Sequence, residues 1–127
     1  MNNILRILTG LLGLLFLLAF GNWLLNPETA VAAIGMPLLT GIAGNSQIGD
    51  LSAFFFCCAV FILMGAWRQQ ASWLVAASFL LGGAALFRVT AAAVHDTDLL
   101  LSAVVGEAVA TAVLLVYAAR LKIQSDA

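Results

Sequence analysis

The sequence predicts an all-α integral membrane protein: a four-helix bundle with a short interfacial segment between helices 1 and 2. Of its 127 residues, 64% are apolar and 9% are charged, whereas soluble domains average roughly half and a quarter. Four apolar stretches are near the length of about 20 residues that a helix needs to cross a bilayer. They cover residues 4–25, 48–66, 72–94 and 99–119, within one transmembrane domain that spans residues 1–127.

The charge balance and the motif content limit the classes of function. The net charge is −1, so there is no basic surface to neutralise phosphates, and nucleic acid is excluded as a partner. No motif for a cofactor or a metal is present, and we expect neither. The remaining partners are membrane lipid, a lipophilic small molecule or a partner membrane protein.

The first apolar stretch resembles a signal peptide at first sight. Arg6 precedes the apolar run, and Ala30-Val31-Ala32 resembles a cleavage site for signal peptidase. The run is about 20 residues long, however, and the apolar part of a signal peptide has only about 7 to 15. We therefore expect residues 4–25 to form a membrane helix.

Residues 26–47 are too polar and too rich in glycine to cross the membrane. Asn26 is placed to cap a short helix with Pro27 at its first position and Glu28 beside the positive end of the helix dipole. Gly35 and Pro37 should end that helix. We expect this segment to lie on the membrane as a packing lid, with a gate over a binding site as the alternative.

The loops predict the orientation. The basic residues at the ends of the four helices all fall on one side of the membrane, whereas the opposite loops contain only acidic residues. The basic residues are Arg6, Arg68, Arg120 and Lys122, and the acidic ones are Glu28, Asp96 and Asp98. The positive-inside rule then places both termini in the cytoplasm. Trp23 should mark the outer end of helix 1 as an interfacial aromatic residue.

Three charged residues lie within the apolar stretches, at Asp50, Arg88 and Glu107. A charge at the bilayer centre costs about 2.5 to 3.5 kcal/mol, so such residues face the bundle interior. At 1.5 Å per residue, Asp50 and Arg88 lie roughly 24 Å from the inner ends of their helices, and Glu107 roughly 18 Å. We expect Arg88 to pair with Glu107, Asp50 or both, either as a functional site or as an ion pair that fixes helix register.

Small residues flank two of these charges. Ala84 and Ala91 share a helix face with Arg88, while Ala103 and Ala110 share one with Glu107. Small residues allow membrane helices to approach closely. Thr111 lies on the Glu107 face and is a further candidate for binding, as is Asn22 at the top of helix 1.

His95 lies two turns beyond Arg88, beside the acidic turn that contains Asp96 and Asp98. It is a candidate binding residue. One histidine and two aspartates cannot complete a four-ligand zinc shell, so no metal site is expected. One of the two aspartates is instead expected to cap helix 4.

The chain resembles a family of small four-helix bacterial membrane proteins of unknown function. The residues that carry the resemblance are Pro27, Gly35-Met36-Pro37, Arg88 followed by Asp96, and Glu107. The resemblance implies the four-helix architecture, a location in the bacterial inner membrane, and a role for Arg88 and Glu107. It implies no substrate.

Three functions fit these residues, in this order. The first is a polar cluster in the outer half of the bundle that binds a small ligand, a lipid headgroup or a partner helix. The second is a cofactor-independent acid/base enzyme acting on a lipophilic substrate as an isomerase, cyclase or epoxide hydrolase, with Asp50, Arg88 and Glu107 as catalytic residues. The third is a transporter component, which is disfavoured because the inner half has no ionisable relay.

The orientation can be tested with reporter fusions. Fusions after Lys122 should report from the cytoplasm and fusions at Asp98 from the outer side, because all loop Lys and Arg residues lie on one side. An outer signal at Lys122, or an inner signal at Asp98, would reverse the orientation.

Overall fold

A computed structural model describes residues 1–127, which form five helices and no strands. The elements are α1 (Asn2–Leu25), α2 (Pro27–Ala33), α3 (Gly41–Arg68), α4 (Ala71–His95) and α5 (Leu101–Ser125). All except α2 are long and apolar enough to cross a membrane. This confirms the predicted all-α fold class and describes a multi-pass membrane protein.

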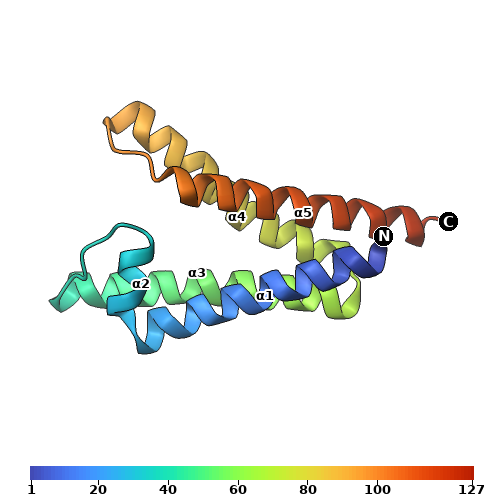
Figure 1. Ribbon diagram of the computed structural model, residues 1–127, viewed down its shortest axis with the longest axis horizontal. Helices are drawn as coiled ribbons and strands as arrows, with labels where there is room; N and C mark the ends of the chain where they lie inside the picture. Colours follow the sequence, from blue (N-terminus) through green and yellow to red (C-terminus); the bar gives the residue numbers. More distant parts are fainter.

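The four long helices are arranged as two pairs (Figure 1). α1 packs mainly on α3, and α4 packs mainly on α5. The pairs converge where the two chain termini and the α3–α4 turn lie, and they diverge toward α2 and the α4–α5 loop. We call the converging end the inner end and the diverging end the outer end, after the orientation that the sequence predicts.

The buried core holds the two pairs together in the inner half. Its largest cluster combines side chains from α3, α4 and α5, with apolar residues of α1 packed against it. The buried members are Cys58, Ile62, Leu74, Ala77, Leu81, Ala110, Leu114, Tyr117, Ala118 and Leu121. Most other apolar side chains, such as Leu18 and Phe79, are exposed, as expected for helices whose outer faces contact lipid.

Arg6 has a structural role that the sequence analysis missed. Its Nε donates a hydrogen bond of 2.9 Å to the carbonyl of Ala66, and one terminal nitrogen donates to the carbonyl of Trp67 at 3.4 Å. These carbonyls lie in the last turn of α3, where helical carbonyls have no partner within the helix. Arg6 therefore caps α3 and fixes α1 against it at the inner end.

At the outer end, α2 covers the top of α1. Pro27 begins the helix as predicted, and Asn26 occupies the capping position. The Asn26 side chain, however, bonds to the hydroxyl of Thr29 rather than to a backbone N–H. Gly35 follows the helix with a φ of 66°, a left-handed conformation that glycine adopts without steric cost.

Trp23 lies at the outer end of α1 as predicted, but the prediction that its side chain is exposed there as an interfacial aromatic residue is wrong. Trp23 is buried beneath α2 in a cluster with Ala30 and Val31. Its ring stacks on Phe55 of α3, with centroids 6.5 Å apart. The interfacial segment covers the end of α1 and so removes this side chain from the membrane surface.

α3 begins at Gly41, well before the predicted start at residue 48. The Gln47 side chain accepts a hydrogen bond from the backbone N–H of Leu39 at 3.0 Å and donates one to the carbonyl of Pro37 at 3.1 Å. This buried amide satisfies the backbone of the turn before α3. The first turns of α3 therefore support the interfacial segment, which explains how a polar sequence continues the helix.

Gly44 brings the backbone of α3 close to this turn. A Cβ at Gly44 would lie 2.9 Å from the carbonyl carbon of Leu39, which belongs to the backbone and cannot rotate away. Gly44→Ala should therefore destabilise the protein by about 1 to 3 kcal/mol through overpacking. The measurement is reversible unfolding in mixed detergent micelles.

Gly49→Ala is the matched control in the same helix. Nothing lies within 4 Å of a Cβ at Gly49, so this change should be neutral or slightly stabilising, as alanine is the better helix former. Equal stability of the two variants would contradict the tight packing at Gly44.

Candidate functional site

Arg88 and Glu107 form the ion pair of the outer half. The Nε of Arg88 donates to both carboxylate oxygens of Glu107, at 3.2 and 3.3 Å. The pair joins α4 to α5. The prediction that Arg88 has a carboxylate partner inside the bundle is confirmed, and the partner is Glu107.

Close approach of α4 and α5 below the pair positions both side chains. A Cβ at Gly82 would lie 3.3 Å from Cγ2 of Thr111, so the glycine leaves room for the Thr111 side chain between the two helices. The hydroxyl of Thr111 donates to the carbonyl of Glu107 at 2.7 Å. Thr111 was a candidate binding residue, but its hydroxyl is used within α5 and it lines none of the cavities described below.

The two partners differ in exposure. The Glu107 side chain is 13% exposed and that of Arg88 is 32% exposed. Only the Nε of Arg88 donates to Glu107, and the two terminal nitrogens of the guanidinium make no hydrogen bond within the chain. Arg88 therefore presents up to four N–H donors that remain available to a ligand.

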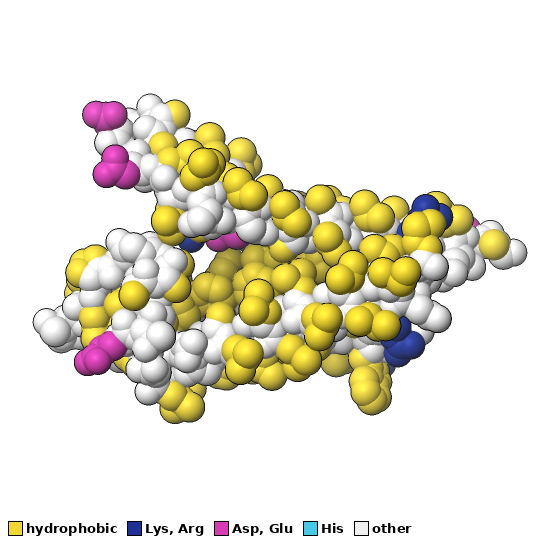
Figure 2. Space-filling view, viewed as in Figure 1, with side chains coloured by type: hydrophobic (Ala, Val, Ile, Leu, Met, Phe, Trp, Pro, Cys, Tyr) yellow, Lys and Arg dark blue, Asp and Glu magenta, His cyan; other side chains and the backbone are white.

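These donors face a groove between the diverging helix pairs. Figure 2 shows this hollow, with basic and acidic groups inside it and apolar side chains on its walls. Three cavities of about 600, 360 and 230 Å³ make up the groove, and each is lined by both Arg88 and Ile34. Ile34 follows α2, so the interfacial segment forms one wall.

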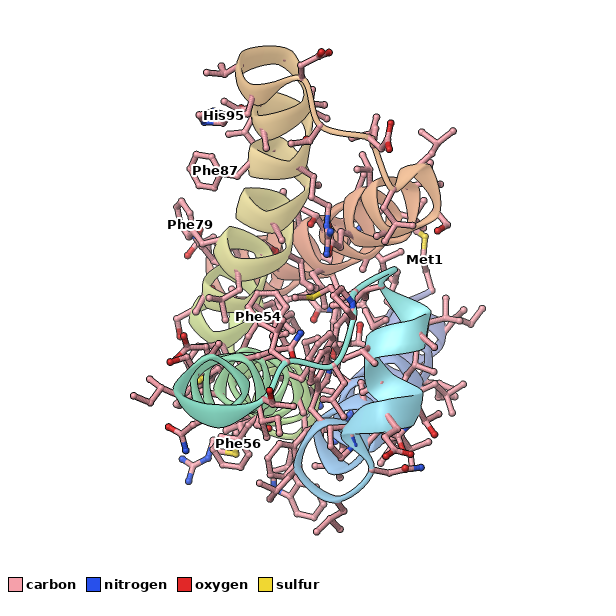
Figure 3. All side chains as sticks on the ribbon, turned by 90° about the vertical axis from the view of Figure 1, so that its left-hand side faces the viewer. Met1, Phe54, Phe56, Phe79, Phe87 and His95 are labelled. Atoms are coloured by element: carbon pink, nitrogen blue, oxygen red, sulfur yellow. The ribbon has the colours of Figure 1, made fainter.

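The smallest cavity lies directly at the ion pair. Leu51, Phe54 and Phe55 of α3 line it together with Glu107. In Figure 3, Phe54 points from α3 toward the α4–α5 pair, whereas Phe56 points to the opposite side of α3. The three consecutive phenylalanines therefore differ in role: Phe54 and Phe55 wall the cavity, and Phe56 is exposed on the other side of α3.

Asp50 lines the largest cavity together with Arg88. Its carboxylate is exposed and takes part in no ion pair or hydrogen bond within the chain. Arg88 is therefore not shared between two carboxylates. Asp50 instead lies across the groove from the ion pair, on the α3 wall.

Two other candidate binding residues lie outside the groove. Asn22 is exposed near the end of α1, and His95 is exposed at the end of α4. Neither lines any of the three cavities. The His95 ring lies on the side of α4 that faces away from α5 (Figure 3).

The structure adds Asp98 to the candidate site. Asp98 lines the 360 Å³ cavity with Arg88 and Gly35. The expectation that Asp96 or Asp98 caps the last helix is wrong, because α5 begins after Leu100 without a side-chain cap and Asp96 instead ends α4 in a left-handed conformation. The extended loop between these helices leaves Asp98 free to face the groove, which spacing along the sequence could not show.

No protein-family model, curated protein or solved structure matches this chain.

The energetic coupling of the pair can be measured with a double-mutant cycle. Arg88→Gln leaves the Glu107 carboxylate in a mostly buried place without its cation, and should destabilise the protein by about 3 kcal/mol. Changing both residues to glutamine should restore most of this loss, because two neutral amides can hydrogen-bond to each other. Reversible unfolding in detergent gives the four free energies. Additive effects of the two single changes would show that the side chains are not coupled.

Proposed function

We propose that the groove binds the polar headgroup of an amphiphilic ligand, with Arg88 as the anchor for its anionic group. The observation that carries this proposal is the guanidinium, which is oriented through Nε by Glu107 while its terminal nitrogens remain without partners. We further propose that the protein belongs to the bacterial inner membrane, with both termini cytoplasmic and the groove open toward the outer leaflet.

The chemistry of arginine supports an anionic group on the ligand. A guanidinium presents its N–H donors in a planar fork that matches phosphate and carboxylate oxygens, and these charge-assisted hydrogen bonds are about twice as strong as neutral ones. Glu107 holds that plane in place before a ligand arrives. Such preorganisation lowers the entropic cost of binding.

The surroundings of the groove support an amphiphile. Its walls include Ile34, Leu51 and Met36 beside the polar residues, and the helix faces that lead away from it are exposed and apolar. A headgroup bound at Arg88 can therefore keep its hydrocarbon chain in the lipid. A wholly soluble ligand would leave these walls without an apolar partner.

Two features favour binding over the other functions. Both carboxylate oxygens of Glu107 already accept from Arg88, which leaves Glu107 poorly placed as a catalytic base. In the inner half, Cys58, Leu74 and Leu114 are completely buried in a continuous apolar core. That core argues against a polar path through the bundle.

Native mass spectrometry of the protein released from lipid nanodiscs tests the proposal. The wild-type protein should retain lipid, and the double variant Arg88→Gln with Glu107→Gln should lose it, because the neutral pair keeps the fold but has no cationic fork. Circular dichroism and thermal unfolding establish that the double variant is folded.

Arg68→Gln is the matched control. Arg68 is the exposed last residue of α3 at the inner end, so the same change there removes a guanidinium without touching the groove. Arg68→Gln should retain lipid like the wild type. Equal retention by the folded double variant and the wild type would contradict the proposal.

A further inference from the structure

Acidic and basic groups gather at opposite ends of the molecule (Figure 2). Arg88 is the only Lys or Arg residue in the outer half, which holds five of the six Asp and Glu residues of the chain. These five are Glu28, Asp50, Asp96, Asp98 and Glu107. Arg88 is already paired with Glu107. The other four carboxylates of the outer half therefore have no Lys or Arg residue as a partner.

This imbalance constrains the ligand of the groove. A headgroup with only negative charge would gain hydrogen bonds from Arg88 but would meet Asp50 and Asp98 on the two sides of it. Juxtaposed like charges oppose binding. A headgroup that also carries a cation gains from both signs of charge.

Asp50 is better placed than Asp98 to receive that cation. Asp50 and Arg88 line one common cavity of about 600 Å³, the largest in the groove, and Ser46 and Gln47 of the preceding turn line it as well. Asp50 belongs to a long helix that is packed against α1, whereas Asp98 belongs to the loop between α4 and α5. A carboxylate on a packed helix is held more firmly than one on a loop.

Resting on the proposed function, we infer that the ligand is zwitterionic, with its phosphate or carboxylate at Arg88 and its ammonium group at Asp50. An aminophospholipid headgroup and a free aminoalkyl phosphate share this chemistry. Asp50 is then the residue that determines specificity, and Arg88 is the residue that provides the anchor.

The test compares two lipids with matched acyl chains, phosphatidylethanolamine and phosphatidylglycerol, in nanodiscs of equal composition. Both carry a phosphate diester, but only the first carries an ammonium group. Native mass spectrometry should show that the wild-type protein retains phosphatidylethanolamine about fivefold more than phosphatidylglycerol, the ratio expected for one additional solvent-accessible charge pair. In Asp50→Asn this ratio should fall to about one.

Asp96→Asn is the matched control, because it removes one negative charge from the outer end at an exposed residue that lines none of the three cavities. Asp96→Asn should keep the preference. An equal loss in both variants would indicate a general effect of surface charge and would overturn the assignment to Asp50. A wild-type protein that prefers phosphatidylglycerol, or an Asp50→Asn variant with an unchanged ratio, would overturn it too.

Two further arms identify the source of the ligand and separate this inference from the proposed function. Displacement of bound lipid by soluble glycerophosphoethanolamine would support a free zwitterion as the ligand, and resistance to displacement would support the lipid. If the wild-type protein retains both lipids equally, and this retention depends on Arg88, only the zwitterion inference is overturned. If the wild-type protein retains no more of either lipid than the folded variant with Arg88→Gln and Glu107→Gln, the proposed function itself is overturned.

Discussion

A guanidinium inside a membrane bundle needs a carboxylate partner, and the structure of the outer half depends on how Arg88 meets this need. Leaving such a charge unpaired is costly in an apolar environment. Glu107 meets it from the neighbouring helix at 3.2 Å, which ties α4 to α5 in one register. The contact uses only Nε, so the same pair that stabilises the bundle leaves the rest of the guanidinium available for binding.

The groove follows from a difference in packing between the two ends. At the inner end, Arg6 caps α3, and Gly65 lies so close to Leu74 that a Cβ would fall 2.7 Å from its Cγ. The two helix pairs are therefore fixed where they converge. At the outer end the pairs diverge toward α2 and the α4–α5 loop (Figure 1), and polar residues line the resulting space. A rigid inner half thus supports an outer half that is open to ligand.

Hydropathy and charge were enough to predict the four helices and a carboxylate partner for Arg88, because both follow from the cost of polar groups in lipid. They left Glu107 and Asp50 both open as that partner. They could not predict that α3 begins at Gly41. Hydropathy reports which residues tolerate lipid, whereas the first turns of α3 are stabilised by Gln47 and the interfacial turn. The burial of Trp23 was missed for the same reason, since it depends on a tertiary contact with α2.

The site was predicted in part. Counting positions along each helix gives depth but not the lateral spacing between helices, so it brought Asp50 to the level of Arg88 without showing that the groove lies between them. The predicted site also included Asn22 and His95, which are exposed outside the groove. Asp98 and Ile34 were missed because a loop and a turn bring them to Arg88, and no helical period describes those segments.

The central claim is that the terminal nitrogens of Arg88 contact the anionic group of a bound headgroup. Solid-state NMR of the protein with 15N-labelled arginine in phospholipid bilayers measures this directly, through the dipolar coupling between guanidinium nitrogens and lipid phosphorus. We predict a terminal-nitrogen signal that is dephased by phosphorus, persists in Arg68→Gln and disappears when Arg88 and Glu107 are both changed to glutamine. A spectrum in which every phosphorus-coupled signal survives that double change would show that lipid contacts only the arginines of the inner end, and would contradict the account.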